Sequence, residues 1–167
     1  AEEAIELARE SGVSWVGVRR SNHAGTGALY ATMPLAHDMI GLYTAVANAN
    51  HMAPWGAQEL LLGTNPLAIA VPAGEEPPIV LDMATTVVSY GTIKKHAQRG
   101  EPLPPGWVVD ARGEPITDPA RAHEGFLLPI GGYKGSGLAL LLGLLAGVLN
   151  GAAFGRDVVD FNADDHT

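Results

Sequence analysis

Three loops in this sequence hold side chains whose types and spacing could carry out chemistry. The first is Ser21-Asn22-His23, which follows the apolar run Val13–Val18. A histidine placed after a buried strand can act as a general acid or base near neutral pH. Ser21 or Asn22 would then fix which ring nitrogen carries the proton. The same residues also fit a simpler arrangement, in which Ser21 and Asn22 cap the next helix and His23 is merely exposed.

The second loop lies where an apolar run ends, in Leu81-Asp82-Met83-Ala84-Thr85. A carboxylate followed by small residues at a strand end could hydrogen-bond a ribose or an amide, because ligands of α/β sheets bind beyond strand ends. Asp82 also fits a structural role, since an aspartate at a helix N-cap accepts hydrogen bonds from backbone amides. The sequence leaves both roles open.

The third loop, Gly132-Tyr133-Lys134-Gly135, opens a long apolar segment. Small residues let a ligand approach the backbone, the N-terminus of a helix attracts anions, and Lys134 adds a positive charge. The glycines fit equally well with a loop in which they serve only the geometry of a turn.

The hydrophobic pattern predicts the elements that position these loops. Helices are expected up to Ser11, over Ala28–His37 with a kink or a new first turn at Pro34, and over Thr85–Arg99. Strands are expected over Val13–Val18, Met39–Val46, Leu67–Val71 and Ile79–Leu81, with loops at Asn48–His51 and Pro54–Gly56. Strands that alternate with helices favour an α/β fold, with a mixed sheet and flanking helices.

The segment from Gly137 to Phe154 is almost entirely apolar and could be mistaken for a membrane span. Asn150 interrupts it, its length is at the lower limit for crossing a bilayer, and it has no aromatic belt. A helix that is apolar all round is usually buried in a core. We therefore expect Leu138–Leu149 to be a buried helix, covered by its own sheet on one side and by another element or subunit on the other. Gly143 and Gly147 would permit the close packing.

Length and composition restrict the class of protein. The chain has 167 residues, close to the size of one domain, and we interpret residues 1–167 as a single domain segment. Its formal net charge of −8 without a basic stripe argues against nucleic acid and anionic membranes as partners. The absence of cysteine excludes disulfides, thiol catalysis and cysteine-based zinc sites, and it is compatible with the cytoplasm.

Several named motifs are absent. No Gly-Lys pair exists for a Walker A loop, and no Ser has the spacing of a nucleophile elbow. The Rossmann fingerprint fails at Gly25-Thr26-Gly27, where the final glycine position is Tyr30, and again at Gly135-Ser136-Gly137. The histidines, His166 included, have no zinc-binding spacing, so no metal site is expected. A dinucleotide site in this chain would therefore not be of the Rossmann type.

The two ends suggest a segment of a longer polypeptide. The chain begins at Ala1 without a methionine, and its last residues, Asp164 to Thr167, form no obvious stop. The first turn is acidic and no early apolar run follows it, which differs from a signal peptide.

Several strings, taken together and in order, resemble the type 2 malate/L-lactate dehydrogenase family over essentially the whole chain. They are Arg19-Arg20-Ser21-Asn22-His23, Met52-Ala53-Pro54-Trp55-Gly56, Leu62-Gly63-Thr64-Asn65-Pro66-Leu67-Ala68, Leu81-Asp82-Met83-Ala84-Thr85, Gly106-Trp107, Thr117-Asp118-Pro119 and Gly131-Gly132-Tyr133-Lys134-Gly135. That family includes malate, lactate, ureidoglycolate and sulfolactate dehydrogenases and some ketimine reductases.

The resemblance implies a non-Rossmann fold that binds NAD or NADP, in homodimers whose sites draw on more than one domain. It implies that His23 is the acid/base residue. It implies cofactor contacts at Asn48, Asp82, Met83, Ala84, Gly132, Tyr133 and Lys134. One departure concerns Asn48, because many members have Thr-Asn-x-x-Pro where this chain has Ala47-Asn48-Ala49-Asn50-His51. The family's N-terminal part, with a Ser-His-Gly motif and basic substrate-binding residues, is not in this sequence, and neither is its C-terminal part.

The expected reaction moves a hydride between the nicotinamide and C2 of a small 2-hydroxy or 2-oxo acid, with His23 exchanging the proton. Two alternatives stay open. The first is an imine (ketimine) reductase on the same scaffold. The second is a non-catalytic remnant that folds and associates but lacks a complete site.

Overall fold

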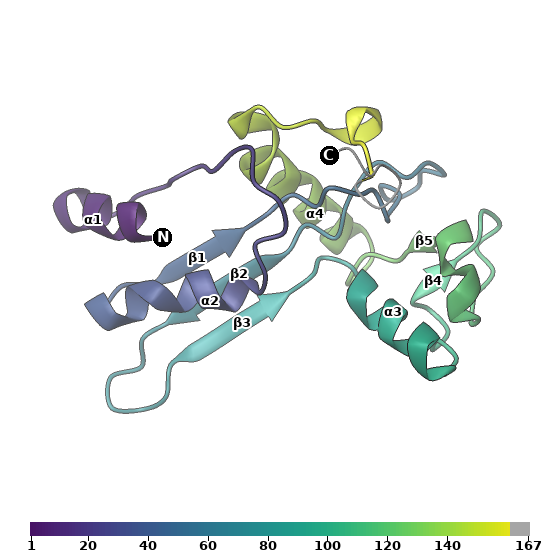
Figure 1. Cartoon of the computed structure of the whole chain (residues 1–167), viewed down its shortest axis with the longest axis horizontal. Coiled ribbons are helices and arrows are strands. Elements are labelled where there is room, and N and C mark those ends of the chain that lie inside the picture. Colours follow the sequence, from purple (N-terminus) through teal and green to yellow (C-terminus); the bar gives the residue numbers. More distant parts are fainter. Residues whose placement is uncertain (161–167) are drawn as a thin grey trace.

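The computed structural model describes residues 1–160. It combines helices with two small sheets, which confirms the α/β class (Figure 1). The α-helices are α1 (Glu2–Ser11), α2 (Gly27–Thr32), α3 (Tyr90–Arg99) and α4 (Tyr133–Ala146). The strands are β1 (Gly41–Thr44), β2 (Leu67–Val71), β3 (Ile79–Met83), β4 (Val108–Val109) and β5 (Phe126–Leu127). The 3₁₀-helices are η1 (Met33–His37), η2 (Pro119–Glu124), η3 (Val148–Asn150) and η4 (Gly155–Asp157).

The larger sheet has the order β1-β2-β3, and β4 pairs with β5 in a separate ribbon. Each of these pairs is antiparallel, so the parallel pairs of the expected mixed sheet are not found in residues 1–160. For β2 and β3, the physical reason is the length of the connection between them. Only the short segment 72–78 joins β2 to β3, and parallel neighbours need a crossover of a dozen residues or more.

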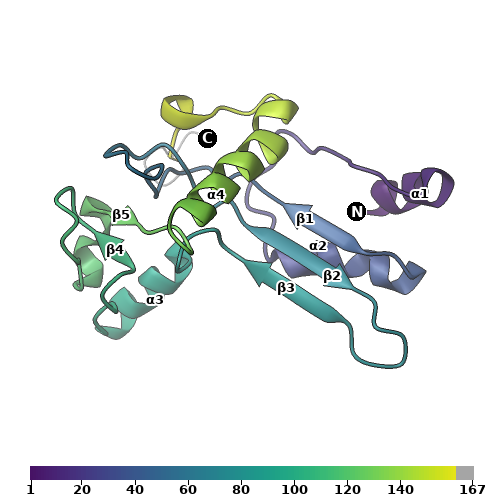
Figure 2. The ribbon, with the colours of Figure 1, turned by 180° about the vertical axis from the view of Figure 1, so that it is seen from behind.

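Helix α2 covers one face of the larger sheet, where small residues let it approach (Figure 1). Ala31 of α2 packs against Ala68 and Ala70 of β2, with Tyr43 of β1 and Leu35 at the edge of this cluster. Within the described residues, no helix lies over the middle of the opposite face (Figure 2). There Leu42, Ile69 and Leu81 form one row across the three strands, and Leu42 and Leu81 are exposed.

The run Val13–Val18 forms no strand, so that prediction is wrong. These residues are extended between α1 and α2, and Val13 and Val18 are 77% and 68% exposed. A β-prone run becomes a strand only where another strand satisfies its backbone amides and carbonyls. No strand pairs with it in the described part of the chain. Within the described residues, the His23 loop is therefore positioned by its own hydrogen bonds and not by a strand that precedes it.

Helix α3 begins five residues later than expected, at Tyr90. Thr85 and Thr86 are buried and hydrogen-bonded outside a helix, to the Thr64 carbonyl and the Val88 carbonyl respectively. Ser89 then caps the helix, since its Oγ accepts a hydrogen bond from the Thr92 amide. The residue pattern that predicted a helix start at Thr85 continues into residues whose backbone groups are hydrogen-bonded to neighbouring loops.

Helix α4 begins at Tyr133, within the glycine-rich loop, and ends at Ala146 rather than at Leu149. Gly147 stands at its C-cap, and the Asn150 side chain donates hydrogen bonds to the carbonyls of Leu145 and Ala146. Those bonds satisfy carbonyls that the end of a helix leaves without partners. The residues Val148–Asn150 turn into η3 instead of continuing α4.

The buried side of α4 does not pack on the sheet, contrary to expectation. Ala139 forms a cluster with Met52 and Leu62, beside Phe154. The other side is exposed in the described chain, because residues 1–160 supply apolar partners to one side only: Leu140, Leu141, Leu144 and Val148 are exposed. Helix α4 therefore has a single covered face here, not two.

One segment, Tyr133–Asn150, is long and apolar enough to cross a bilayer by composition, with a mean hydropathy of 1.3 over 18 residues. A third of it is buried inside the chain. Core helices of globular proteins pass the same test, and the contact of Ala139 with Met52 and Leu62 is of that kind.

Candidate functional site

His23 lies in the exposed loop between α1 and α2, and its ring is held by the loop's own backbone. The Gly25 amide donates a hydrogen bond of 3.0 Å to Nδ1 of His23. A neutral imidazole that accepts at Nδ1 carries its proton on Nε2. Neither Ser21 nor Asn22 makes this contact, so the residue that sets the tautomer is Gly25. Its φ of 85° lies in the left-handed region that glycine favours.

Asp82 lies in β3 and is bound to the start of α2. Its Oδ2 accepts hydrogen bonds of 2.8 Å from Thr26 Oγ1 and of 2.8 Å from the Ala28 amide. The sequence left open a helix-capping role for Asp82. The structure shows such contacts, but to the helix that precedes β3 and not to the one that follows it.

The end of β3 lies beside the glycine-rich loop. The Ile130 amide donates a hydrogen bond of 2.9 Å to the Thr85 carbonyl, and Thr86 forms a bridge with Pro129. Met83 and Ala84, which precede these residues, are half-buried. The structure therefore brings the second and third candidate loops together, and Asp82 joins the first to them.

The glycine-rich loop turns at Gly131 and Gly132, whose φ values are 61° and 65°. No side chain caps the N-terminus of α4 that follows, and Tyr133 and Lys134 are exposed there. First-turn amides without a side-chain cap, next to a lysine, are a suitable set of donors for a phosphate. These residues fit the pyrophosphate of a dinucleotide cofactor.

Trp55 also contacts this loop, a role that no sequence motif indicated. Its amide donates a hydrogen bond of 2.9 Å to Ser136 Oγ, and its ring meets Tyr133 edge to face, with 6.5 Å between ring centroids. A Cβ at Gly132 would lie 3.3 Å from the indole. The only sequence signal was the position of Trp55 within the string Met52–Gly56.

Asn48 is exposed in the segment between β1 and the Met52–Gly56 string, and Asn65 holds that segment. Asn65 Oδ1 accepts a hydrogen bond of 3.0 Å from the Ala47 amide. The neighbouring Thr64 carbonyl accepts from both the amide and the Oγ1 of Thr85. The segment of Asn48 and the end of β3 are therefore bound to two adjacent residues, Asn65 and Thr64 respectively.

His51 is a second histidine near these loops, and it is half-buried. Its ring stacks on Tyr90 of α3, with 4.1 Å between centroids and 3° between planes. Burial lowers the pKa of His51, Lys94 acts in the same direction, and Asp160 opposes them. No sequence pattern indicates this histidine's partner, because Tyr90 is far along the chain.

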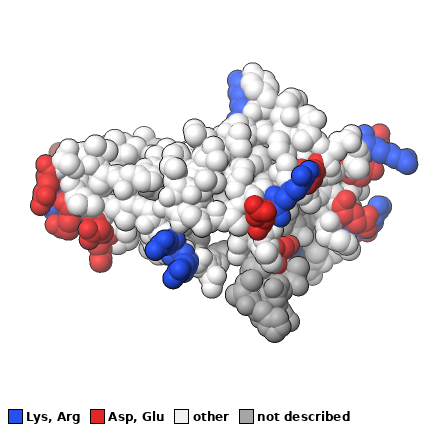
Figure 3. All heavy atoms as spheres, turned by 90° about the horizontal axis from the view of Figure 1, so that it is seen from above, with Lys and Arg blue, Asp and Glu red and all other residues white. Residues whose placement is uncertain are grey.

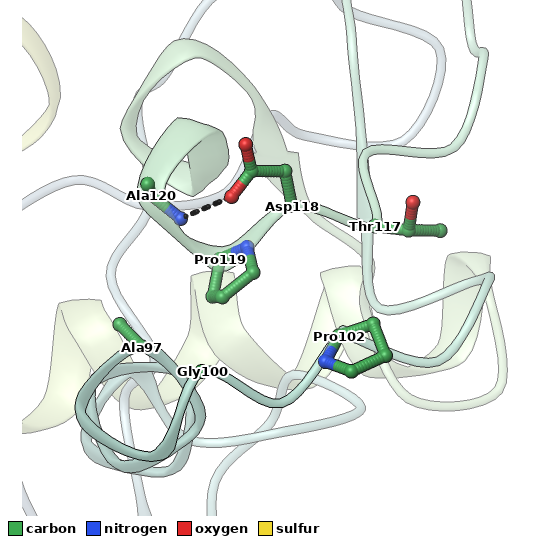
Figure 4. A pocket seen from close by; sticks show the side chains of 7 residues that line it. All are labelled: Ala97, Gly100, Pro102, Thr117, Asp118, Pro119 and Ala120. Atoms are coloured by element: carbon green, nitrogen blue, oxygen red, sulfur yellow. Dashed lines mark hydrogen bonds between the residues drawn. The ribbon is translucent and has the colours of Figure 1, made fainter.

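Two pockets on the described chain are lined mainly by other residues. One of about 470 Å³ lies between the end of α3 and η2 (Figure 4). It is lined by residues such as Ala97, Pro102 and Asp118, and Asp118 Oδ1 accepts a hydrogen bond from the Ala120 amide. None of the expected site residues lines it. The other, of about 390 Å³, is bordered by Trp55 and the β4–β5 ribbon.

Within residues 1–160, no group of three histidine, aspartate or glutamate side chains converges as metal ligands. His166 lies outside the described residues. Seen from above, one group of acidic side chains lies at the end of the molecule that carries α1 (Figure 3). Much of the rest of this face is uncharged.

Comparison with known proteins gives one consistent result. The sequence relatives include an L-sulfolactate dehydrogenase from Methanothermobacter thermautotrophicus, 44% identical over 93% of this chain. A ureidoglycolate dehydrogenase (NAD(+)) from Escherichia coli O157:H7 is 37% identical over 99%. A (2R)-3-sulfolactate dehydrogenase (NADP(+)) from Chromohalobacter salexigens is 38% identical over 96%. The chain spans 45%, 46% and 48% of their lengths, about half in each case.

Solved structures share the fold. A dehydrogenase from Sinorhizobium meliloti matches with a TM-score of 0.83 and 40% identity, covering 92% of this chain and 45% of that one. A delta1-piperideine-2-carboxylate reductase from Pseudomonas syringae pvar. tomato matches with a TM-score of 0.87 and 33% identity, covering 96% and 48%. The family model described as malate/L-lactate dehydrogenase matches residues 1–167. The chain belongs to the malate/L-lactate dehydrogenase family.

Proposed function

We propose that the full-length protein is an NAD(P)-dependent oxidoreductase that acts at C2 of a small 2-hydroxy or 2-oxo acid. One observation carries this proposal beyond family membership. Hydrogen bonds join the His23 loop to β3 through Asp82, and join the segment after β3 to the glycine-rich loop through Thr85 and Ile130. The histidine proposed as the acid/base residue and the loop proposed to bind phosphate are thereby joined to one strand end.

The cofactor would be held by residues from three parts of this arrangement. The expected contacts are Asn48, then Met83 and Ala84, and then Gly132, Tyr133 and Lys134. Asp82 adjoins Met83, but its carboxylate is hydrogen-bonded to Thr26 and Ala28. Lys134 and the first amides of α4 would meet the phosphates. The bound nicotinamide supplies or accepts the hydride at C2, and the protein's part is to orient the acid and exchange its proton.

His23 would donate a proton to the oxygen on C2 during reduction and take it back during oxidation. A proton-donating His23 is doubly protonated, so its Nδ1 no longer has a lone pair to accept from Gly25. The hydrogen bond between Gly25 and His23 must therefore open when the ring becomes charged. Because the neutral ring keeps its proton on Nε2, Nδ1 is the atom that takes the proton during oxidation, and the bond to Gly25 forms again once Nδ1 has given that proton to the substrate during reduction.

A second candidate function is the reduction of a cyclic imine to an amine. The structural match with delta1-piperideine-2-carboxylate reductase favours it, because that protein shares the fold at 33% identity. In this reaction a carbon–nitrogen double bond is reduced instead of a carbon–oxygen double bond, and His23 would again donate the proton. A non-catalytic remnant is the third candidate, and it predicts no turnover with either class of substrate.

We further propose a homodimer in the cytoplasm that binds neither nucleic acid nor membrane. The net charge of −8 supports the exclusion of nucleic acid.

The deciding experiment is a substrate panel on the full-length protein. Malate, lactate, sulfolactate and ureidoglycolate are offered with NAD and NADP, and the 2-oxo acids and cyclic imines with NADH and NADPH. Turnover is read by nicotinamide absorbance. Activity on a 2-hydroxy or 2-oxo acid supports the first candidate, and activity confined to imines supports the second. Absence of turnover across the panel would sink both.

A further inference from the structure

We propose that Asp82 is a positioning residue, whose carboxylate acts through Thr26 and Ala28 to fix the loop that carries His23. This inference rests on the proposed function, because it assigns Asp82 a part in the same proton transfer. It differs from the role that family resemblance gives Asp82, which is contact with the cofactor.

The first support is the pair of hydrogen bonds to a single oxygen. Thr26 is the N-cap of α2 and Ala28 lies in its first turn, and both donate to Asp82 Oδ2 at 2.8 Å. Thr26 itself makes no side-chain cap to the helix. A carboxylate accepting from an amide at a helix start is a charge-assisted contact, stronger than a neutral hydrogen bond. Asp82 therefore supplies the cap from a neighbouring strand.

The second support is the place of Asp82 in the sheet. Tyr43, Ala68 and Asp82 occupy one row across β1, β2 and β3. Gly27 lies directly on this row, since a Cβ there would be 3.0 Å from Tyr43 Cδ1 and 3.1 Å from Ala68 Cβ. A Cβ at position 27 would press on Tyr43 and Ala68, so the glycine there lets the start of α2 lie close to this row and within hydrogen-bonding distance of Asp82.

The third support is that the loop is held on both sides of Gly25. On one side the Tyr30 hydroxyl donates a hydrogen bond of 2.9 Å to the Ala24 carbonyl, and Tyr30 stacks on Tyr43 at 5.0 Å. On the other side Thr26 is bound to Asp82. Gly25, fixed between these two contacts, donates its amide to His23.

These contacts form a path from β3 to the imidazole that runs Asp82, Thr26, Gly25, His23. A misplacement of about 1 Å can cost a reaction about 100-fold in rate. Loss of the Thr26 contact frees one side of Gly25, so it should lower the rate of proton transfer and leave cofactor binding intact. If Asp82 contacted the cofactor instead, loss of the Thr26 contact would leave the rate of proton transfer unchanged, and loss of the Asp82 carboxylate would weaken cofactor binding.

The test compares Thr26→Val with Thr26→Ser in the full-length enzyme, since Val removes the hydroxyl at equal size and Ser keeps it. We expect Thr26→Val to lower kcat about ten-fold, with the Kd of NADH or NADPH unchanged. Thr26→Ser should restore kcat to within about two-fold. Asp82→Ala should lower kcat at least as much, and the double variant Thr26→Val/Asp82→Ala should be no slower than Asp82→Ala alone.

A second readout needs no activity. Hydrogen exchange of the amides over residues 24–28 should accelerate in Thr26→Val and in Asp82→Ala, while exchange in α3 stays as in the wild type. If Asp82→Ala weakens cofactor binding and Thr26→Val changes neither kcat nor exchange, the positioning role is overturned. If the wild type turns over no substrate but exchange responds as expected, the proposed function fails and the contact survives. If Asp82→Ala does not fold, the comparison of Thr26→Val with Thr26→Ser tests the positioning role by itself.

Discussion

Asn65 joins helix α4 to the segment before Asn48. Its Nδ2 donates a hydrogen bond of 2.8 Å to the Ala139 carbonyl of α4, while its Oδ1 accepts from Ala47. The side chain is only 1% exposed. One buried amide group therefore fixes two of the segments from which the cofactor contacts are expected.

Replacing Asn65 by Ala should destabilise the protein by about 2–4 kcal/mol, because the buried Ala139 carbonyl and the half-buried Ala47 amide each lose their hydrogen bond to this side chain. Chemical denaturation of the full-length protein measures this change. Asn48→Ala is the matched control, since Asn48 is exposed and its loss should alter stability by no more than about 0.5 kcal/mol. Equal stability of the two variants would show that Asn65 does not hold these segments together.

His23→Ala should lower turnover by about 100-fold or more and leave cofactor affinity nearly intact, because the ring exchanges the proton and does not hold the dinucleotide. Steady-state kinetics and cofactor titration separate these two effects. His123→Ala, at an exposed histidine of η2, is the control and should behave as the wild type. Wild-type turnover in His23→Ala would remove His23 from the mechanism.

Lys134→Ala should weaken NADH or NADPH binding by about 1–3 kcal/mol if its charge meets a phosphate. The affinity of the wild type should also fall more steeply with salt than that of the variant, because screening acts on the charge that the variant lacks. Lys95→Ala, at an exposed lysine of α3, controls for net charge. Unchanged cofactor titration in Lys134→Ala would make Lys134 structural or substrate-facing.

Gly147→Leu should destabilise the protein or its assembly by about 1–3 kcal/mol through overpacking. A Cβ at Gly147 would lie 2.6 Å from the Gly143 carbonyl and 3.2 Å from Val46 Cγ1. Gly137, on the same helix, has no atom within 4 Å of such a Cβ, so Gly137→Leu should be tolerated. Thermal melting and size-exclusion chromatography compare the two variants, and equal tolerance would contradict close packing at Gly147.

His51 should make stability depend on pH. Burial lowers its pKa in the folded protein below the unfolded value of 6.5, so the unfolded chain binds the proton more readily. Stability should therefore fall as the pH drops below about 6.5. His51→Phe keeps a ring against Tyr90 and removes the titrating group, so its stability should change less between pH 7 and pH 5. Identical pH profiles in denaturation experiments would exclude this contribution.

The sequence alone determined most of the helices, three strands and the family. Periodicity placed β2 at Leu67–Val71, as predicted, and Pro34 marked the change from α2 to η1. These features are local, because they depend on the spacing of apolar residues and on the backbone limits of proline. The motif strings identified the family because several short patterns occur in a fixed order.

Tertiary structure decided what the local patterns could not. Val13–Val18 has the composition of a strand but no neighbour to pair with, and α4 has two apolar sides but partners for only one of them in the described chain. Asp82 caps a helix more than fifty residues before it, which no spacing rule reveals. Pairing, burial and long-range hydrogen bonds depend on which segments meet in space. That is a property of the whole fold and not of any window of residues.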